Sequence, residues 1–366
     1  MTRLIVAFAL LLAGAAQAET FDTSAGKVEV QPVVQDLDGP WSVAFLPGGA
    51  LLITEVGGDL VLIEGDRRRQ ISGVPKVRAS GQGGLLDVVA DPNFATNKTV
   101  YLSYSEPVGV RSARTAVARA KLNILSARLD NLTVLFRQSP ESGGGRHFGS
   151  RIVPDGNGNL FVTLGDRGSR DDVQDPNNHF GKVIRIRTDG SVPPDNPFVN
   201  GGALPEIWSI GHRNPQGAAL DESGQLWTVS HGARGGDEIN RPQPGLNYGW
   251  PVISYGVHYS GGQIGEGTSK PGMEQPVWYW DPSIAPSGMA IYSGKLWPEW
   301  RGSIFVGALK FSLVSRLSRD GTRITGEEQL FKGRFGRIRD VREGPDGALW
   351  VLSQSRGVLY RVTPAR

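Results

Sequence analysis

The stretch SGGGRHFGSRIVPDGNGNLFVTLGDRG, residues 142–168, contains the unit from which the whole chain is built. A short apolar run at 152–153 is followed by the turn PDGNG at 154–158 and by a second apolar run at 160–164. Asn and Gly adopt positive φ at low cost, so this turn predicts a β-hairpin. The hairpin brings His147 and Asp166 to the same end of two antiparallel strands. An imidazole beside a carboxylate on rigidly held loops suits general-base chemistry, although such a pair can equally be structural.

The same pattern, a turn followed by a short apolar strand, recurs six times along the chain. These strands begin at Leu51, Val100, Leu160, Leu226, Ile304 and Leu349. A shorter strand rich in small residues precedes each of them, which suits the crowded inner strand of a propeller. We therefore predict an all-β fold, a six-bladed β-propeller with four-stranded antiparallel blades. Residues 27–34 and 357–362 also resemble strands, so we expect the ring to close by pairing the two ends of the chain.

The composition supports this fold class and excludes several kinds of chemistry. The 366 residues include 50 Gly and 24 Pro, as expected for short strands and tight turns. There is no Cys, which excludes disulfides, thiolate metal ligands and a thiol nucleophile. The net charge of +3 is weak support for a nucleic-acid partner, and we predict none.

The N-terminus has the organisation of a secretory signal peptide. Arg3 provides a positive start, residues 4–16 are apolar, and Ala16-Gln17-Ala18 matches a cleavage site. The apolar run is too short for a membrane span. We predict a signal peptide at residues 1–18, a single propeller domain at 19–366, no membrane span and a periplasmic location.

The loops at one end of the predicted propeller carry most of the candidate site residues. Loops that enter an inner strand and loops that leave the next strand emerge at this end. They contain Gln82, His147, Asp166, Arg213, Asn214, Ser287, His231-Gly232-Ala233, Lys310, Arg337 and Arg339. Arg213, Lys310, Arg337 and Arg339 would surround the channel mouth. Such a cluster of cations favours an anionic ligand, because arginine forks suit carboxylates.

Several motifs in these loops resemble those of the soluble PQQ-dependent glucose and aldose sugar dehydrogenases. They are GQGGLLDVVADPNF (81–94), GRHFGSRI (145–152), GNLFVTLGDRG (158–168), IWSIGHRNPQGAAL (207–220), SHGARGGDEIN (230–240), GLNYGWP (245–251) and IAPSGMAIY (284–292). They occur in the order of that family and cover nearly the whole mature chain. The resemblance implies a six-bladed propeller, in agreement with the repeat.

The resemblance also implies roles for individual residues in the oxidation of an aldose by PQQ. His147 matches the general base, Asp166 the carboxylate beside it, and Arg213 a catalytic and cofactor-binding group. Further cofactor-binding residues are Gln82, Asn214, Lys310, Arg337 and Arg339. The carbonyls of Gly232 and Ala233 match ligands of a Ca²⁺ that also binds PQQ, with Ala233 where the family usually has proline. Glu238 and the Tyr248 carbonyl resemble a second, structural calcium site, and the electron acceptor stays unidentified.

Two other functions are compatible with a propeller, because this fold hosts many activities. A calcium-dependent lactonase needs a metal held by carboxylates at the channel centre, whereas this mouth is richer in Arg and Lys. A non-enzymatic binding platform needs neither a base nor the cations.

Overall fold

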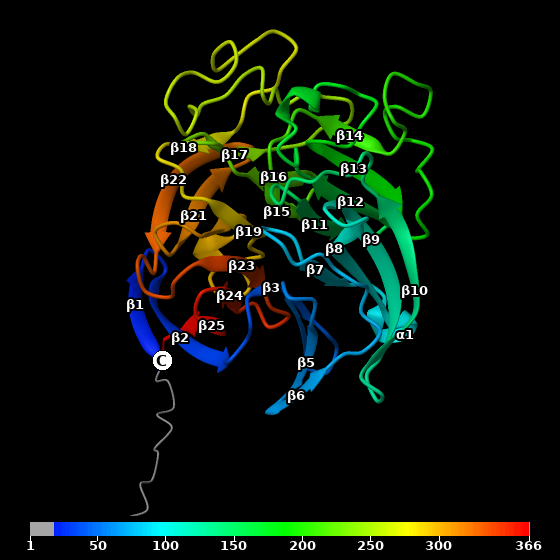
Figure 1. Ribbon diagram of the computed structural model, residues 1–366. Coiled ribbons are helices and arrows are strands. Elements are labelled where there is room, and N and C mark those ends of the chain that lie inside the picture. Colours follow the sequence, from blue (N-terminus) through cyan, green and yellow to red (C-terminus); the bar gives the residue numbers. More distant parts are fainter. Residues whose placement is uncertain (1–17, 366) are drawn as a thin grey trace, which may run out of the picture.

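Six antiparallel sheets surround a common axis in the computed structural model, which describes residues 18–365 (Figure 1). This arrangement confirms the six-bladed propeller predicted from the repeat. Apart from Ala18, the signal peptide predicted at residues 1–18 lies outside the described residues.

The first five blades each use four consecutive strands, arranged from the axis outward. Blade 1 contains β3 (Pro40–Phe45), β4 (Leu51–Glu55), β5 (Leu60–Glu64) and β6 (Arg67–Gln70). Blade 2 contains β7 (Leu85–Ala90), β8 (Thr99–Val108), β9 (Ser112–Asn123) and β10 (Arg128–Arg137). Blade 3 contains β11 (Gly149–Pro154), β12 (Asn159–Leu164), β13 (Lys182–Arg187) and β14 (Ile207–Ile210). Blade 4 contains β15 (Pro215–Leu220), β16 (Leu226–Ser230), β17 (Asp237–Asn240) and β18 (Trp278–Trp280). Blade 5 contains β19 (Pro286–Ile291), β20 (Ile304–Ala308), β21 (Leu313–Asp320) and β22 (Arg323–Leu330).

Blade 6 joins the two ends of the chain, as the sequence predicts. Its inner strands are β23 (Ile338–Glu343), β24 (Leu349–Ser353) and β25 (Val358–Pro364), and β2 (Gly26–Val34) pairs with β25. A fifth strand, β1 (Glu19–Thr23), pairs with β2 and was not expected from the sequence. Its five residues alternate between partly buried and exposed, which is a weak signal. Phe21 anchors it against Phe331 at a ring distance of 5.1 Å.

A bulge near the start of each inner strand links neighbouring blades. The register against the second strand shifts there in all six blades. In blades 1 to 3, a hydroxyl of the second strand accepts a hydrogen bond from an inner-strand N–H within the bulge. The same hydroxyl donates to a carbonyl of the next blade: Thr54 to Leu86 (2.5 Å), Ser103 to Ser150 (2.6 Å) and Thr163 to Pro215 (2.8 Å). Bulges of this kind redirect the side chains around them.

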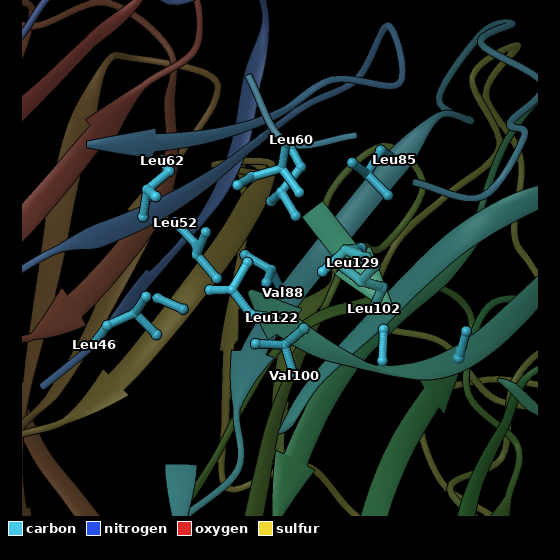
Figure 2. Close-up of a cluster of buried hydrophobic side chains, with 14 of the residues drawn as sticks. Leu46, Leu52, Leu60, Leu62, Leu85, Val88, Val100, Leu102, Leu122 and Leu129 are labelled. Atoms are coloured by element: carbon cyan, nitrogen blue, oxygen red, sulfur yellow. The ribbon is translucent and has the colours of Figure 1, made fainter. Parts of the chain in front are cut away.

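The hydrophobic core is divided among the contacts between adjacent blades. Figure 2 shows one such cluster, in which Leu52, Leu60 and Leu62 of blade 1 face blade 2. The blade 2 side chains in this cluster include Leu85, Val88, Val100 and Leu102. Five comparable clusters fill the other blade junctions. Burial of apolar surface stabilises the ring by roughly 25 cal/mol per Å².

Helices are short in the described part of the chain. They are α1 (Phe94–Asn97) and the 3₁₀ turns η1 (Arg170–Asp172) and η2 (Pro298–Trp300). None of the helices within residues 18–365 has the length and apolar character needed to cross a bilayer.

Four charged side chains fill the central channel, and we call them the channel cluster: Asp87, Arg151, Asp340 and Arg342. Arg151 of blade 3 pairs with Asp87 of blade 2 at 2.9 Å and with Asp340 of blade 6 at 3.1 Å. Arg342 pairs with the same two aspartates at 2.9 and 2.8 Å. Asp87 and Asp340 are fully buried. The two positive and two negative charges therefore balance one another across three blades.

We expect Asp87→Asn to lower the free energy of unfolding by about 3–5 kcal/mol, because it leaves the charges of Arg151 and Arg342 to share the single carboxylate of Asp340. Urea unfolding measures the change. Asp66→Asn is the control, because Asp66 is exposed on a hairpin turn and should alter stability by less than about 0.5 kcal/mol. Equal stability of Asp87→Asn and the wild type would show that the channel cluster does not hold the blades together.

Candidate functional site

Two adjoining cavities open where the inner strands begin, and Gln82 lines both. The arginine cavity has a volume of about 390 Å³ and is lined by Trp41, Gln216, His231, Arg337, Arg339 and Gln354, among others. The histidine cavity has a volume of about 310 Å³ and is lined by His147, Asp166, Arg213, Ala233, Trp250 and Tyr259, among others. The sequence therefore correctly predicts that loops from distant blades converge at this end.

His147 and Asp166 form a hydrogen-bonded pair in the histidine cavity. His147 Nδ1 lies 2.6 Å from Asp166 Oδ1, and the Asp166 side chain is almost completely buried. The other carboxylate oxygen, Oδ2, accepts a hydrogen bond from Trp250 Nε1 at 2.9 Å. An ionised carboxylate only accepts hydrogen bonds, so the proton lies on Nδ1 and Nε2 is left as the basic nitrogen.

The surroundings of this pair keep the imidazole neutral and the carboxyl ionised. Burial lowers the pKa of His147 below its usual 6.5, and the opposing effect of Asp166 does not fully compensate. Burial alone would raise the pKa of Asp166, but the hydrogen bond with His147 and the nearby charges hold it below 3.8. Because the unfolded chain binds a proton on His147 more readily, acidification below about pH 6.5 reduces the stability contributed by this histidine. Above that pH the imidazole is free to accept a proton.

Contacts from three blades hold the His147 loop in place. The backbone N–H of His147 donates to Gln82 Oε1 at 2.7 Å, and that of Gly149 donates to Asn214 Oδ1 at 3.1 Å. A side chain at position 165 would collide with the His147 carbonyl, so glycine is required there. His147 itself has a φ of 55°, an uncommon conformation for a residue with a side chain. The backbone of this loop is therefore fixed before any ligand binds.

Arg213 lies between the base and the Gly232 segment. Its guanidinium donates through Nη1 to the Gly232 carbonyl and stacks over the Trp250 ring at 5.2 Å. Its Nε is buried and has no hydrogen-bond partner within the described structure. A buried donor without a partner is costly, so this group fits a site that receives an acceptor from a ligand.

Arg339 lies at the floor of the arginine cavity, where only 8% of its surface is exposed. Burial lowers its pKa to about 9, with further contributions from Arg337 and Arg151. Its donated hydrogen bonds go to the amide oxygens of Gln354 and Gln216. Arg337 is exposed and donates to the Leu309 carbonyl at 3.3 Å. These two positive charges are therefore available to an anion.

Other predicted site residues lie outside the lining of the two cavities. Asn214 holds the Gly149 backbone, as described above, and Lys310 is exposed with its Nζ 4.8 Å from the centre of the Phe311 ring. Glu238 accepts a hydrogen bond from Asn240, and burial raises its pKa to about 7. Tyr248 stacks on His212.

The metal ligands predicted in the Gly232 segment are backbone groups. Asp237 holds this segment by accepting a hydrogen bond from the Gly232 N–H at 2.8 Å. Within residues 18–365, no three acidic or histidine side chains meet in a group that could hold a metal ion. A cation at this end of the propeller would thus depend on carbonyl oxygens and on oxygens of a ligand.

Several residues of the site were missed from the sequence. Trp250 holds Asp166 although 84 positions separate them, and Gln216 and Gln354 line the arginine cavity beside His231, which the sequence does place at this end. His258 and Tyr259 line the histidine cavity from the long loop between β17 and β18. The only sequence signal for Gln216 is its place two residues after Asn214 in GHRNPQG.

We expect Asp166→Asn to lower the pKa of His147 further, because the carboxylate is the group that favours the imidazolium. NMR titration of the histidine signals measures this change. Asp171→Asn, an exposed carboxylate nearby, should leave the His147 titration unchanged. A rise of the His147 pKa in Asp166→Asn would contradict the assigned pairing.

Comparisons with known proteins find relatives over nearly all of the described chain. The sequence profile of the Glucose / Sorbosone dehydrogenase family matches residues 37–361. The chain is 46% identical to Aldose sugar dehydrogenase YliI of Escherichia coli (strain K12), over 92% of this chain and 93% of that protein. The crystal structure of the soluble aldose sugar dehydrogenase from Escherichia coli in its apo form superposes with a TM-score of 0.89 at 45% identity, covering 92% of this chain and all of that one.

A PQQ-bound structure is also among the similar proteins. The aldose sugar dehydrogenase from Streptomyces coelicolor in its PQQ-bound form has a TM-score of 0.76 at 27% identity, covering 92% of this chain and 98% of that one. The family profile spans nearly the entire described chain, and the relatives are similar over their full lengths. The chain therefore belongs to the glucose / sorbosone dehydrogenase family.

Proposed function

We propose that this protein is a quinoprotein that oxidises aldose sugars at the anomeric carbon to lactones, with PQQ as its cofactor. The observation that carries the proposal is that two cavities meet at Gln82. One holds the His147–Asp166 pair, and the other holds arginines that have no carboxylate partner among residues 18–365. The PQQ-bound relative supports the choice of cofactor. The predicted signal peptide supports a periplasmic location for the mature chain.

The arginine cavity fits the chemistry of PQQ. PQQ is a tricarboxylate, and Arg339 presents a buried charge whose present partners are neutral amides. Arg337 adds a second cation at the rim, and Lys310 is available on the adjacent loop. The orphaned Nε of Arg213 lies at the side of the histidine cavity. Fixed donors of this kind offset ligand charge without reorganisation.

Ca²⁺ is proposed as a second component of the site. Carbonyl oxygens are suitable ligands for this hard cation, and Gly232 and Ala233 supply two of them. The Gly232 carbonyl also accepts a hydrogen bond from Arg213, which uses one of the two lone pairs of this oxygen. The partly buried Glu238, whose raised pKa reflects its burial and the neighbouring Asp237, supports the proposed second site with the Tyr248 carbonyl.

The His–Asp pair supplies the proton transfer. His147 Nε2 accepts the proton of the anomeric hydroxyl, while Asp166 stabilises the imidazolium that forms and holds the ring in one orientation. Trp250 keeps Asp166 in place through its indole N–H. PQQ, when bound, would supply the acceptor for the hydride released from the anomeric carbon. Arg213, between the base and the cavity wall, stabilises negative charge as it develops.

The lactonase alternative is less compatible with the channel. Asp87 and Asp340, the carboxylates at the channel centre, are both neutralised by Arg151 and Arg342. They therefore lack free oxygen ligands for a catalytic cation. Lactone hydrolysis by the protein free of PQQ would nevertheless revive that alternative.

Reconstitution of the purified protein with PQQ and Ca²⁺ should give reduction of an artificial dye that depends on added aldose. In His147→Gln, turnover should fall by roughly 10²–10⁴-fold, the range for loss of a general base, because the substitution removes the proton acceptor. PQQ affinity, measured on the same preparation, should change little. Absence of sugar oxidation in a wild-type protein that binds PQQ would contradict the proposed function.

A second prediction concerns the anion-binding side. Arg339→Ala should weaken PQQ binding by about 2–5 kcal/mol, or roughly 30- to 4000-fold. The substitution removes the cation that would form a partly buried ion pair with a PQQ carboxylate in the complex. Turnover at saturating PQQ should change far less, since the base lies in the other cavity. Arg67→Ala, which removes an exposed charge on the outer strand of blade 1, serves as the control in the binding titration. Unchanged affinity in Arg339→Ala would exclude Arg339 from the cofactor site.

A further inference from the structure

The environment of Arg339 differs from that of the other two arginines near the axis. Arg151 and Arg342 in the channel cluster are each paired with two aspartates. Arg339, three residues from Arg342 in the sequence, is held by two glutamines. The arginines of the channel are therefore paired with carboxylates, whereas the arginine of the cavity has no carboxylate beside its guanidinium within the described structure.

The two glutamines fix the orientation of the Arg339 guanidinium. Gln354 Oε1 accepts from Nε at 3.2 Å and from Nη2 at 2.8 Å. Gln216 Oε1 accepts from Nη1 at 2.9 Å. These contacts use three of the five N–H donors of a guanidinium and leave two for a ligand. The side chain is thus held in place before an anion arrives, which reduces the entropic cost of binding.

Both glutamines are themselves fixed by the propeller. The Gln216 carbonyl accepts a hydrogen bond from Arg151 Nε at 3.0 Å, so this residue rests directly on the channel cluster. Its side-chain oxygen also lies 3.1 Å from His231 Nε2. The Gln354 backbone N–H donates to the Arg337 carbonyl at 2.9 Å. The support of Arg339 therefore comes from blades 4 and 6 together.

We propose that Gln216 and Gln354 are positioning residues that orient Arg339 while leaving its charge uncompensated, so that the cavity keeps its affinity for a carboxylate ligand. This inference rests on the proposed function for the identity of that ligand, PQQ. An amide oxygen satisfies the guanidinium donors without adding negative charge. A carboxylate at the same position would form an internal ion pair and compete with the ligand.

The decisive variant is Gln354→Glu, which has nearly the same shape and places a carboxylate beside Arg339. We expect the dissociation constant for PQQ to rise at least tenfold, while the urea midpoint of the protein without PQQ stays equal or rises. A merely structural role predicts instead that stability and affinity fall together. Gln354→Met removes the acceptor without adding charge, and should lower the stability of the free protein with a smaller loss of affinity. Gln31→Glu, exposed on β2, controls for the added charge.

A second probe separates this inference from the proposed function. Citrate, a simple tricarboxylate, should raise the thermal midpoint of the wild-type protein, and Gln354→Glu should abolish that increase. If the wild type fails to bind PQQ but shows this citrate effect, the proposed function is wrong and the inference stands. If Gln354→Glu binds PQQ within twofold of the wild type, or if citrate stabilises both proteins equally, the inference is overturned.

Discussion

The balanced group of Asp87, Arg151, Asp340 and Arg342 is the constraint on which the other features of this propeller depend. Its members come from blades 2, 3 and 6, and the two aspartates are fully buried. Ion pairs in such surroundings add little net stability, but losing one partner is costly. The group therefore fixes how these inner strands lie relative to one another. Arg151 also supports Gln216, and through it the floor of the arginine cavity.

Paired charges and unpaired charges occupy different places along the propeller axis. Charges in the channel are paired, whereas Arg339 at the cavity floor keeps its charge and Arg213 keeps a donor without a partner. The His147–Asp166 pair lies beside this region, with its carboxylate buried and its imidazole neutral. Because of this separation, the arginines can bind a polyanion while the neighbouring His147–Asp166 pair remains able to act as a base.

The fold could be predicted from the sequence because each blade repeats its own local signal. The strands starting at Leu51, Val100, Leu160, Leu226, Ile304 and Leu349 all lie where the pattern places them, within one residue. The fifth strand of blade 6 could not be found, because its short alternating pattern depends on aromatic contacts with residues more than 300 positions away.

The candidate site could be predicted only in part. His147, Asp166 and Arg213 could be placed at the site because they lie in loops at the ends of predicted strands, and the strand ends determine which loops converge. The partners Trp250, Gln216 and Gln354 depend on which way side chains point across blade junctions, and local sequence carries no such information. Lys310 illustrates the limit, since its loop lies at the expected end while its side chain does not line either cavity.

We propose that the two cavities form one site for PQQ and Ca²⁺. The most direct test of this proposal is an equilibrium titration of the purified protein with PQQ, with Ca²⁺ present and with Ca²⁺ removed by a chelator. We expect PQQ to bind at micromolar concentration or below, and the chelator to weaken this binding at least tenfold. Failure to bind PQQ at micromolar concentration in the presence of Ca²⁺ would contradict it.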